Sequence, residues 1–175
     1  LIAHVAYSAS GAKQITGQEL PYQLAIIFAA VFYLILGLQF TRSTLLQLGL
    51  TDRIVALTLM VLVLGTGLPY YAIISPAMSH VYAFAAIAWC MFEARRAWTD
   101  RPYAPQRLAL ALAVTLLIRP THALIIPLLP VVALGDGRNV LHWIRSQRPG
   151  PWLRAAVMGA AVLLIQPLAW HAQSG

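Results

Sequence analysis

Long stretches without a charged side chain constrain the fold of this chain more than any other feature. No charged residue occurs between Glu19 and Arg42, within 54–92 or within 155–170. The 20 residues 21–40 can cross the roughly 30 Å hydrocarbon core of a bilayer as a helix rising about 1.5 Å per residue. The sequence therefore predicts an all-α fold, a polytopic bundle of transmembrane helices.

The composition excludes the other broad classes of protein. Only 10% of the residues are charged and 60% are hydrophobic, whereas soluble domains carry about 25% charged residues. So high an apolar content also excludes intrinsic disorder, and the single cysteine, Cys90, excludes a scaffold held together by disulfides. In a membrane protein the net charge of +7 indicates topology rather than binding to nucleic acid.

Glycine and proline divide the longer apolar stretches. The residues Gly-Thr-Gly-Leu-Pro at 65–69, followed by Ser75-Pro76, favour an uncharged loop over 66–78. Arg119-Pro120 interrupts 108–134 near its middle, where proline removes a backbone hydrogen bond and arginine is costly in the bilayer. We therefore expect six hydrophobic helices, at approximately 21–40, 54–68, 77–97, 108–118, 121–134 and 155–170.

The distribution of basic residues distinguishes a single crossing from a hairpin over 108–134. If Arg119 is the tip of a hairpin of two short helices, the loops 41–53, 94–107 and 135–154 share one side of the membrane. These loops contain ten of the 12 Lys and Arg residues, namely Arg42, Arg53, Arg95, Arg96, Arg101, Arg107, Arg138, Arg145, Arg148 and Arg154. A single crossing would abolish this asymmetry, so we predict the hairpin, with the basic loops cytoplasmic. Residues 6–20, 66–78 and Arg119 are then extracytoplasmic, and Lys13 is the other basic residue on that side.

The two ends of the sequence indicate a piece of a longer protein. The chain begins with Leu1 rather than methionine, ends on Gln173-Ser174-Gly175 just after an apolar stretch, and shows no signal peptide. We expect residues 1–175 to form part of one transmembrane domain that is truncated at both ends. The loop 135–154 is either a plain cytoplasmic loop or a short amphipathic stretch at the membrane surface.

Arg119 is the leading candidate for a functional residue. An ionisable side chain at membrane depth is a functional hypothesis by default, and a guanidinium group matches phosphate oxygens with two hydrogen bonds. At an extracytoplasmic hairpin tip, Arg119 could hold the phosphate of a lipid carrier whose tail lies in the bilayer. The alternatives are an arginine that extends to lipid headgroups, or one that binds carbonyls freed by Pro120.

Four further residues are candidate substrate-binding groups on the same side. His80 could donate a hydrogen bond to a sugar hydroxyl or phosphate, and His122 lies one turn from Arg119. Tyr70 and Tyr71 could stack on a sugar ring, or could belong to the aromatic belt at the membrane interface. Both histidines could instead pack or cap beneath the loop.

Other kinds of site have little support in the sequence. Glu19 is the only acid on the proposed outer side, and beside Pro21 it is interpreted as a solvated charge at a helix start rather than a general base. Gly65-Thr66-Gly67 lacks the strand and the third glycine of a nucleotide-binding loop. The five histidines lack metal-site spacing, so no metal site or cofactor is visible, and Cys90 is expected to be a small buried side chain.

Short motifs, in order along the chain, resemble a known family. They are Gly-Thr-Gly-Leu-Pro-Tyr-Tyr at 65–71, Pro-Ala-Met-Ser-His-Val-Tyr-Ala-Phe at 76–84, Leu-Ile-Arg-Pro-Thr at 117–121 and Trp-His-Ala-Gln-Ser-Gly at 170–175. With these motifs the sequence resembles bacterial membrane glycosyltransferases of the GT-C superfamily, the class that includes protein mannosyltransferases and aminoarabinose transferases. The resemblance covers most of the chain.

The resemblance implies an enzyme of the bacterial inner membrane that takes a sugar from a polyprenyl-phosphate donor on the outer face. A carboxylate would deprotonate the acceptor hydroxyl, which attacks the anomeric carbon with inversion, while Arg119 stabilises the departing lipid phosphate. The family takes this base from its first outer loop, which here would lie before Leu1, so the catalytic residue is unknown. Some members add a divalent metal. The implied partners are membrane lipids and a polyprenyl-phosphate-linked sugar, without nucleic acid, and the oligomeric state is open.

Three other functions remain open at this point. A transporter or lipid flippase also uses broken helices and a membrane-depth arginine, but it predicts inverted halves with matching breaks. A polymerase or ligase of lipid-linked polysaccharide would share the donor with a glycosyltransferase and differ in helix order. In a structural subunit, Arg119 would be dispensable.

Overall fold

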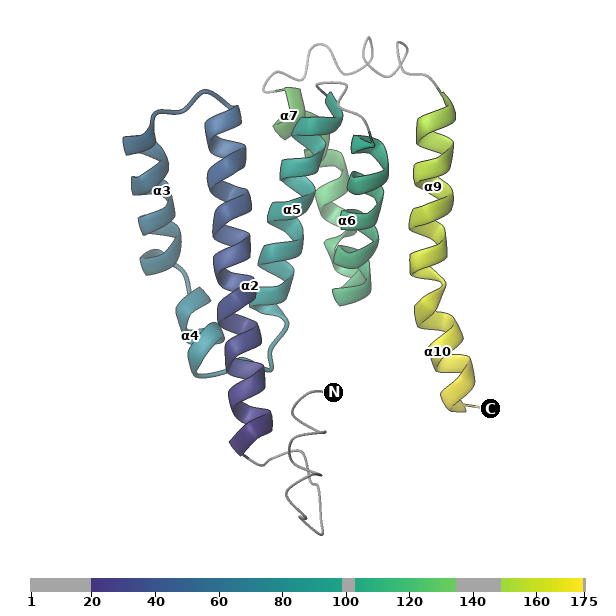
Figure 1. Cartoon of the computed structure of the whole chain (residues 1–175), viewed down its shortest axis with the longest axis horizontal. Helices are drawn as coiled ribbons and strands as arrows, with labels where there is room; N and C mark the ends of the chain where they lie inside the picture. Colours follow the sequence, from purple (N-terminus) through teal and green to yellow (C-terminus); the bar gives the residue numbers. More distant parts are fainter. Residues whose placement is uncertain (1–19, 99–102, 135–148, 175) are drawn as a thin grey trace.

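The computed structural model describes residues 20–98, 103–134 and 149–174, and within these ranges the chain is helical and contains no strand. The elements in chain order are α2 (Leu20–Gln47), α3 (Asp52–Gly65), α4 (Leu68–Ile73), α5 (His80–Trp98), α6 (Ala104–Ile118), the 3-10 helix η1 (Pro120–Leu128), α7 (Leu129–Leu134), α9 (Pro149–Leu163) and α10 (Ile165–Ser174) (Figure 1). The all-α prediction is confirmed for these residues. Lys13, Glu19 and most of the loops 6–20 and 135–154 lie outside them.

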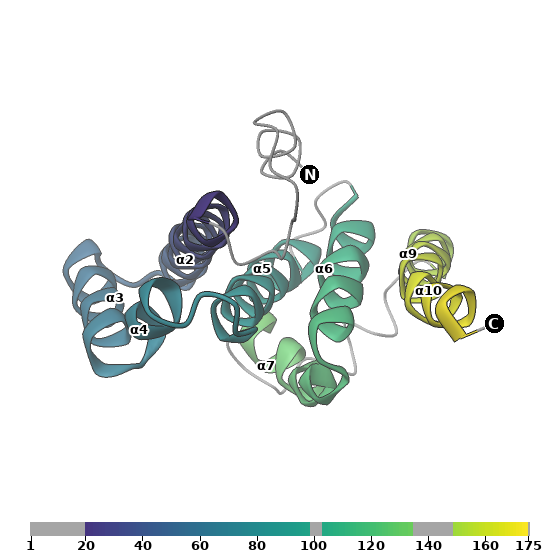
Figure 2. The same ribbon diagram turned by 90° about the horizontal axis from the view of Figure 1, so that it is seen from below.

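Helix α5 is the centre of the bundle. Helices α2 and α6 both pack along it, α7 packs against it as well, and α9 packs on the outer side of α6. Helices α3 and α4 lie against α2 (Figure 2). Most of the buried residues of α5 are alanines, including Ala85, Ala88 and Ala94, so neighbouring backbones can approach it closely.

Two helical segments are long and apolar enough to cross a membrane, Leu20–Gln47 and Pro149–Gln173. Much of their surface faces away from the bundle, and Phe28 on α2, for example, is 71% exposed. Helices α3 and α6 have 14 and 15 residues, fewer than the roughly 20 that a straight crossing needs. The structure therefore suggests membrane association through two apolar helices, and the predicted bundle of six membrane-embedded helices is not confirmed.

The helix that the sequence predicts to end at residue 40 continues to Gln47. Arg42 suggested a boundary, but a long side chain at a helix end can extend its charge outward without ending the helix. The stop is Gly49, which has a φ of +82°. The amide of Gly49 donates to the carbonyl of Leu46 at 3.0 Å, and the amide of Leu50 donates to that of Leu45 at 3.3 Å, the pattern of a glycine-capped helix end.

The loop predicted over 66–78 contains a short helix. The helix predicted over 54–68 begins two residues earlier, at Asp52, an acid that suits the positive end of a helix dipole, and ends at Gly65. Helix α4 then occupies Leu68–Ile73. Glycine and proline favour a loop, but Pro69 lies in the first turn of α4, where its missing amide costs nothing.

The helices predicted over 121–134 and 155–170 differ from the prediction, and prolines account for the difference. The second arm of the hairpin, predicted as a helix over 121–134, is the 3-10 helix η1 followed by α7, and Pro127 lies inside η1. The helix predicted over 155–170 begins at Pro149 and is interrupted at Leu164. Pro167 has no amide to donate to the carbonyl four residues earlier, which explains the interruption.

The chain reverses at Arg119-Pro120, as the sequence predicts. Both Nη1 and Nη2 of Arg95, near the end of α5, donate to backbone carbonyls: to Ala133 at the end of α7, and to Gln47 at the end of α2 at 3.0 Å. The ends of these three helices therefore meet, and we call this region the basic end. Because α6 runs away from the basic end and η1 and α7 return to it, Arg119 lies at the end of α6 that is remote from the basic end (Figure 1).

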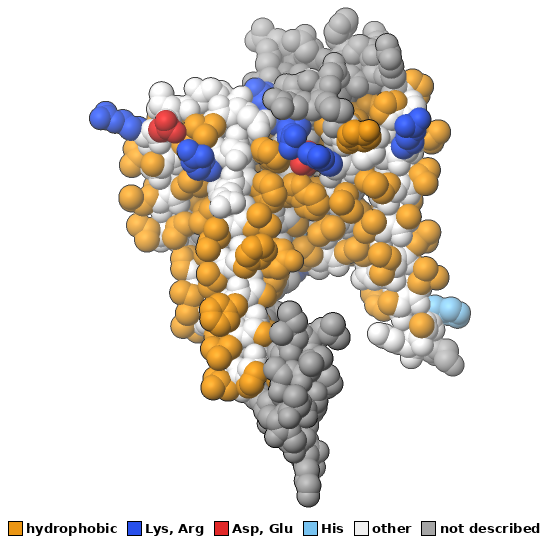
Figure 3. Space-filling model, in the orientation of Figure 1, with side chains coloured by type: hydrophobic (Ala, Val, Ile, Leu, Met, Phe, Trp, Pro, Cys, Tyr) orange, Lys and Arg blue, Asp and Glu red, His pale blue; other side chains and the backbone are white. Residues whose placement is uncertain are grey.

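The other described arginines gather toward the basic end, where blue side chains form a band across the molecule (Figure 3). They lie toward the ends of α2 and α5 and toward the starts of α3, α6 and α9: Arg42, Arg53, Arg95, Arg96, Arg107 and Arg154. Below this band the visible surface is mostly hydrophobic (Figure 3). Arg119 is thus the described arginine that departs from the pattern.

Gly37 allows α2 to lie directly on α5. The buried residues of α2 are Ala30, Gly37 and Thr44, one small residue at every seventh position. A Cβ atom on Gly37 would lie 2.5 Å from Cε1 of Phe84 and 3.1 Å from Cα of Ala85. The contact between the two helices therefore depends on the absence of a side chain at this position.

Replacing Gly37 with alanine should destabilise the protein by about 1–3 kcal/mol, because the Phe84 ring and the α5 backbone must move apart from α2. Thermal or denaturant unfolding in detergent measures the loss. Gly65→Ala is the matched control, since its nearest contact would be Cγ1 of Val61 at 3.8 Å. Equal unfolding midpoints for the two variants would contradict the close approach.

Candidate functional site

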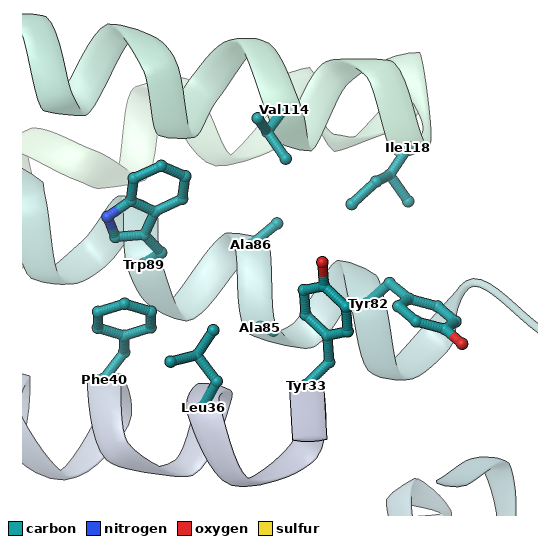
Figure 4. A pocket seen from close by; sticks show the side chains of 9 residues that line it. All are labelled: Tyr33, Leu36, Phe40, Tyr82, Ala85, Ala86, Trp89, Val114 and Ile118. Carbon is teal, nitrogen blue, oxygen red and sulfur yellow. The ribbon is translucent and has the colours of Figure 1, made fainter. Parts of the chain in front are cut away.

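An apolar groove of about 570 Å³ lies between α2 and α6, with α5 as its floor (Figure 4). It is lined by Tyr33, Leu36 and Phe40 from α2, by Tyr82, Ala85, Ala86 and Trp89 from α5, and by Val114 and Ile118 from α6. The only side-chain polar atoms of this lining are two phenol oxygens and one indole nitrogen. Such a lining suits a hydrocarbon chain better than a sugar or a nucleotide.

The two tyrosines mark the end of the groove that is remote from the basic end. The rings of Tyr33 and Tyr82 meet edge to face, with their centroids 5.2 Å apart. The Tyr82 hydroxyl donates to the carbonyl of Pro76 at 3.1 Å, which ties the groove to the segment before α5. Ile118 lines the groove at this same end (Figure 4).

Arg119 follows Ile118 directly, at the end of α6. Its backbone turns to an extended conformation, with a φ of −153°, while its amide still donates to the carbonyl of Thr115 at 3.2 Å. The carbonyl of Arg119 accepts from the amide of His122 at 3.0 Å and so starts the returning segment. The Arg119 side chain is exposed, and in the chain it directly follows Ile118, which lines the groove.

The structure gathers three of the sequence-predicted residues into one aromatic group. Tyr71 and His80 lie ring to ring with centroids 4.2 Å apart, and Tyr70 meets Tyr71 edge to face at 5.5 Å. Helix α4 supplies both tyrosines, and His80 is the first residue of α5, two residues before Tyr82. This group, Tyr70, Tyr71 and His80, therefore adjoins the end of the groove that Tyr82 lines.

His122 belongs with Arg119 rather than with the aromatic group. It lies in the first turn of η1, and its Nδ1 atom is buried without a hydrogen-bond partner in the described part of the chain. The two sets of predicted residues are thus placed at the same end of the bundle, on α4–α5 and on α6–η1. Among the described residues, no hydrogen bond or ring contact joins one set to the other.

The acids of the described chain lie at the other end. Asp52 begins α3 and is 3.9 Å from Arg42, with both side chains largely exposed. Glu93 lies in the last turns of α5 and is 3.7 Å from Arg96. Within residues 20–98, 103–134 and 149–174, no carboxylate is therefore available beside Arg119 as a base. No group of three His, Cys, Asp or Glu side chains there could hold a metal ion, so a divalent metal has no assigned ligands.

Cys90 is fully buried, as the sequence predicts, and packs between α5 and α6. Its Sγ atom is 3.2 Å from Oγ1 of Thr115, which in turn donates to the carbonyl of Ala111 at 2.8 Å. Both side chains are fully enclosed. Cys90 therefore holds two helices of the groove together rather than facing a ligand.

Sequence reasoning missed the groove and its lining residues Tyr33 and Trp89. Both lie within apolar stretches, where an aromatic side chain gives no sign of whether it faces lipid or a neighbouring helix. Spacing offers one signal: Tyr33 and Phe40 are seven residues apart, as are Tyr82 and Trp89, and side chains at that spacing lie on one face of a helix.

The function of this chain is inferred from its own residues, because comparison with known proteins does not indicate one. No protein-family model matches the chain, and no curated protein or solved structure matches it.

Proposed function

We propose that this chain belongs to a membrane glycosyltransferase and binds its donor, a sugar linked to a polyprenyl phosphate. One observation carries the proposal: the apolar groove ends at Ile118, and the next residue is the exposed cation Arg119. An exposed cation next in the chain to the end of an apolar groove fits an amphiphile with an anionic head and a hydrocarbon chain. A lipid phosphate is such a molecule, and guanidinium binds phosphate with two parallel hydrogen bonds.

In the proposed reaction, the acceptor hydroxyl attacks the anomeric carbon of the sugar. The bond between that carbon and the phosphate oxygen breaks, and polyprenyl phosphate leaves with the electron pair. Arg119 stabilises the negative charge that develops on the leaving phosphate. A carboxylate takes the acceptor proton. Asp52 and Glu93 are not candidates for this base, because both lie toward the basic end, away from Arg119.

The aromatic group of Tyr70, Tyr71 and His80 is the proposed sugar site. Tyr70 is 54% exposed, so its ring is accessible for stacking on a sugar. His80, held against Tyr71, can donate to a hydroxyl or to the phosphate. His122 is placed one turn beyond Arg119 as a second donor toward the phosphate.

We place the protein in the bacterial inner membrane with its basic end in the cytoplasm. The exposed apolar surface supports the membrane location, since soluble monomers rarely expose large contiguous apolar patches. The gathered arginines support the orientation. Cysteines introduced at Asp52 and Thr121 should react with an impermeant reagent from opposite faces. The chain without them is the control, because Cys90 is buried; reaction from one face alone would refute the orientation.

The test of the proposed activity uses the full-length protein with undecaprenyl phosphate that carries a radiolabelled sugar. A glycosyltransferase should release undecaprenyl phosphate and transfer the label to an acceptor in a membrane extract. A flippase would move the labelled lipid across a vesicle membrane without breaking the bond between sugar and phosphate. A polysaccharide polymerase or ligase would give long lipid-linked or lipid-released chains. Only the first result agrees with the proposal.

A further inference from the structure

The groove ends at a group of aromatic side chains. Phe40 and Trp89 line its end nearest the basic end, and their rings are stacked with centroids 6.3 Å apart and an angle of 18° between their planes. Phe92, on the next turn of α5, lies against Phe40 at 5.4 Å. Figure 4 shows Phe40 and Trp89 facing each other at one end, with Tyr82 and Ile118 at the other. We call Phe40, Trp89 and Phe92 the aromatic stop.

Two charged side chains, Glu93 and Arg96, contact the residues of the aromatic stop. Nε1 of Trp89 donates to Oε1 of Glu93 at 3.4 Å, and Nη1 of Arg96 lies 3.7 Å from the same oxygen. The Arg96 guanidinium also lies over the Phe92 ring, 5.2 Å from its centroid. Glu93 is only 3% exposed. Burying a carboxylate costs several kcal/mol unless it is well paired. Oε1 contacts Trp89 and Arg96, whereas Oε2 is buried without a hydrogen-bond partner in the described part of the chain.

The distance between the two ends of the groove follows from helix geometry. The lining begins at Tyr33 on α2 and Tyr82 on α5 and stops at Phe40 and Trp89, seven residues further on each helix. At about 1.5 Å per residue this is roughly 10 Å. Helix α2 continues for another seven residues to Gln47, so the groove ends well before the helix does, at the aromatic stop.

We propose that the aromatic stop limits how far the hydrocarbon chain of a prenyl phosphate enters the groove from the Arg119 end. This inference rests on the proposed function, which supplies the prenyl phosphate as the ligand. The first part of the chain, next to the phosphate, occupies the roughly 10 Å between Ile118 and Trp89. The remainder of a longer chain leaves between α2 and α6. The protein thus recognises the phosphate and the first isoprene units and is indifferent to the length beyond them.

The experiment maps where the chain end lies in the full-length protein. Geranyl, farnesyl and geranylgeranyl phosphates with a photoreactive diazirine at the end of the chain are bound and irradiated, and the labelled residues are identified by mass spectrometry. The end of the geranyl chain should label Phe40 and Trp89, whereas the ends of the two longer chains leave between α2 and α6 and should label these residues less. None of the three should label Thr44, the next buried residue of α2 beyond the aromatic stop.

Trp89→Ala should open the stop and raise labelling at Thr44 several-fold for the longest probe. Phe40→Ala, which opens the same end from α2, should give the same shift and provides a second test if one variant does not fold. Leu36→Ala is the matched control, because Leu36 lines the middle of the groove and its loss leaves the end closed. Labelling of Thr44 in the unaltered protein, or an unchanged pattern in both end variants, would overturn the stop. No labelling by any probe in the unaltered protein would instead refute the prenyl-phosphate ligand itself.

Discussion

Arg119→Ala should weaken binding of farnesyl phosphate by about tenfold to a hundredfold, since hydrogen bonds to charged groups contribute roughly 1.5–3 kcal/mol. Binding of farnesol, which has the same chain and no phosphate, should be unchanged. The two ligands should differ because Arg119 directly follows Ile118, the last residue of α6 that lines the groove. Its removal therefore alters the site for the phosphate and leaves the site for the hydrocarbon chain intact. Titration of both ligands into the full-length protein in detergent measures the two dissociation constants.

Two further variants make the Arg119 result specific. Arg119→Lys keeps the charge and loses the paired geometry of the guanidinium, so it should bind farnesyl phosphate with intermediate affinity. Arg154→Ala removes an exposed arginine from α9, toward the basic end, and should bind as the unaltered protein does. Equal weakening for farnesol and farnesyl phosphate in Arg119→Ala would show a structural role, and unchanged affinity for both would exclude Arg119 from the phosphate site.

The existence of most helices could be predicted because the charge-free stretches leave a chain in lipid no other way to satisfy its backbone. The helix ends could not be predicted in this way, because charged residues do not mark where these helices begin or end. Arg42 and Arg154 both lie inside helices, whereas the true ends depend on backbone geometry. Gly49 ends α2 by adopting a positive φ, and Pro149 fits the first turn of α9.

In the candidate site, too, a local feature could be recognised from the sequence, whereas a feature that depends on long-range contacts could not. Arg119 could be singled out as a candidate from the sequence because an arginine beside a proline within an apolar stretch is unusual in itself. The groove was not predictable, because it depends on the rotation of α2 about its axis relative to α5. That rotation is fixed by packing between distant residues, Gly37 against Phe84 above all, and one sequence carries no direct record of such pairs.

Arg95 should contribute more to stability than any other described arginine, since it joins the ends of three helices. It donates to the carbonyls of Ala133 in α7 and Gln47 in α2, 38 and 48 residues away. Neither α2 nor α7 has a basic residue in its own last turn, so Arg95 supplies the cation that favours the negative end of both helix dipoles. Helix α7, with six residues, is too short to persist without such support.

Arg95→Met should therefore lower the free energy of unfolding by about 3 kcal/mol, the sum of two charge-assisted hydrogen bonds at the lower end of their range. Methionine keeps most of the chain length and removes every donor, so packing is largely retained. Arg107→Met, an exposed arginine on α6 toward the same end, is the matched control and should change stability little. Denaturant unfolding measures the loss, and hydrogen exchange should locate it at α7 and at the end of α2. A loss spread evenly over the chain, or one as small as that of Arg107→Met, would show that the three helix ends are held by apolar packing and not by Arg95.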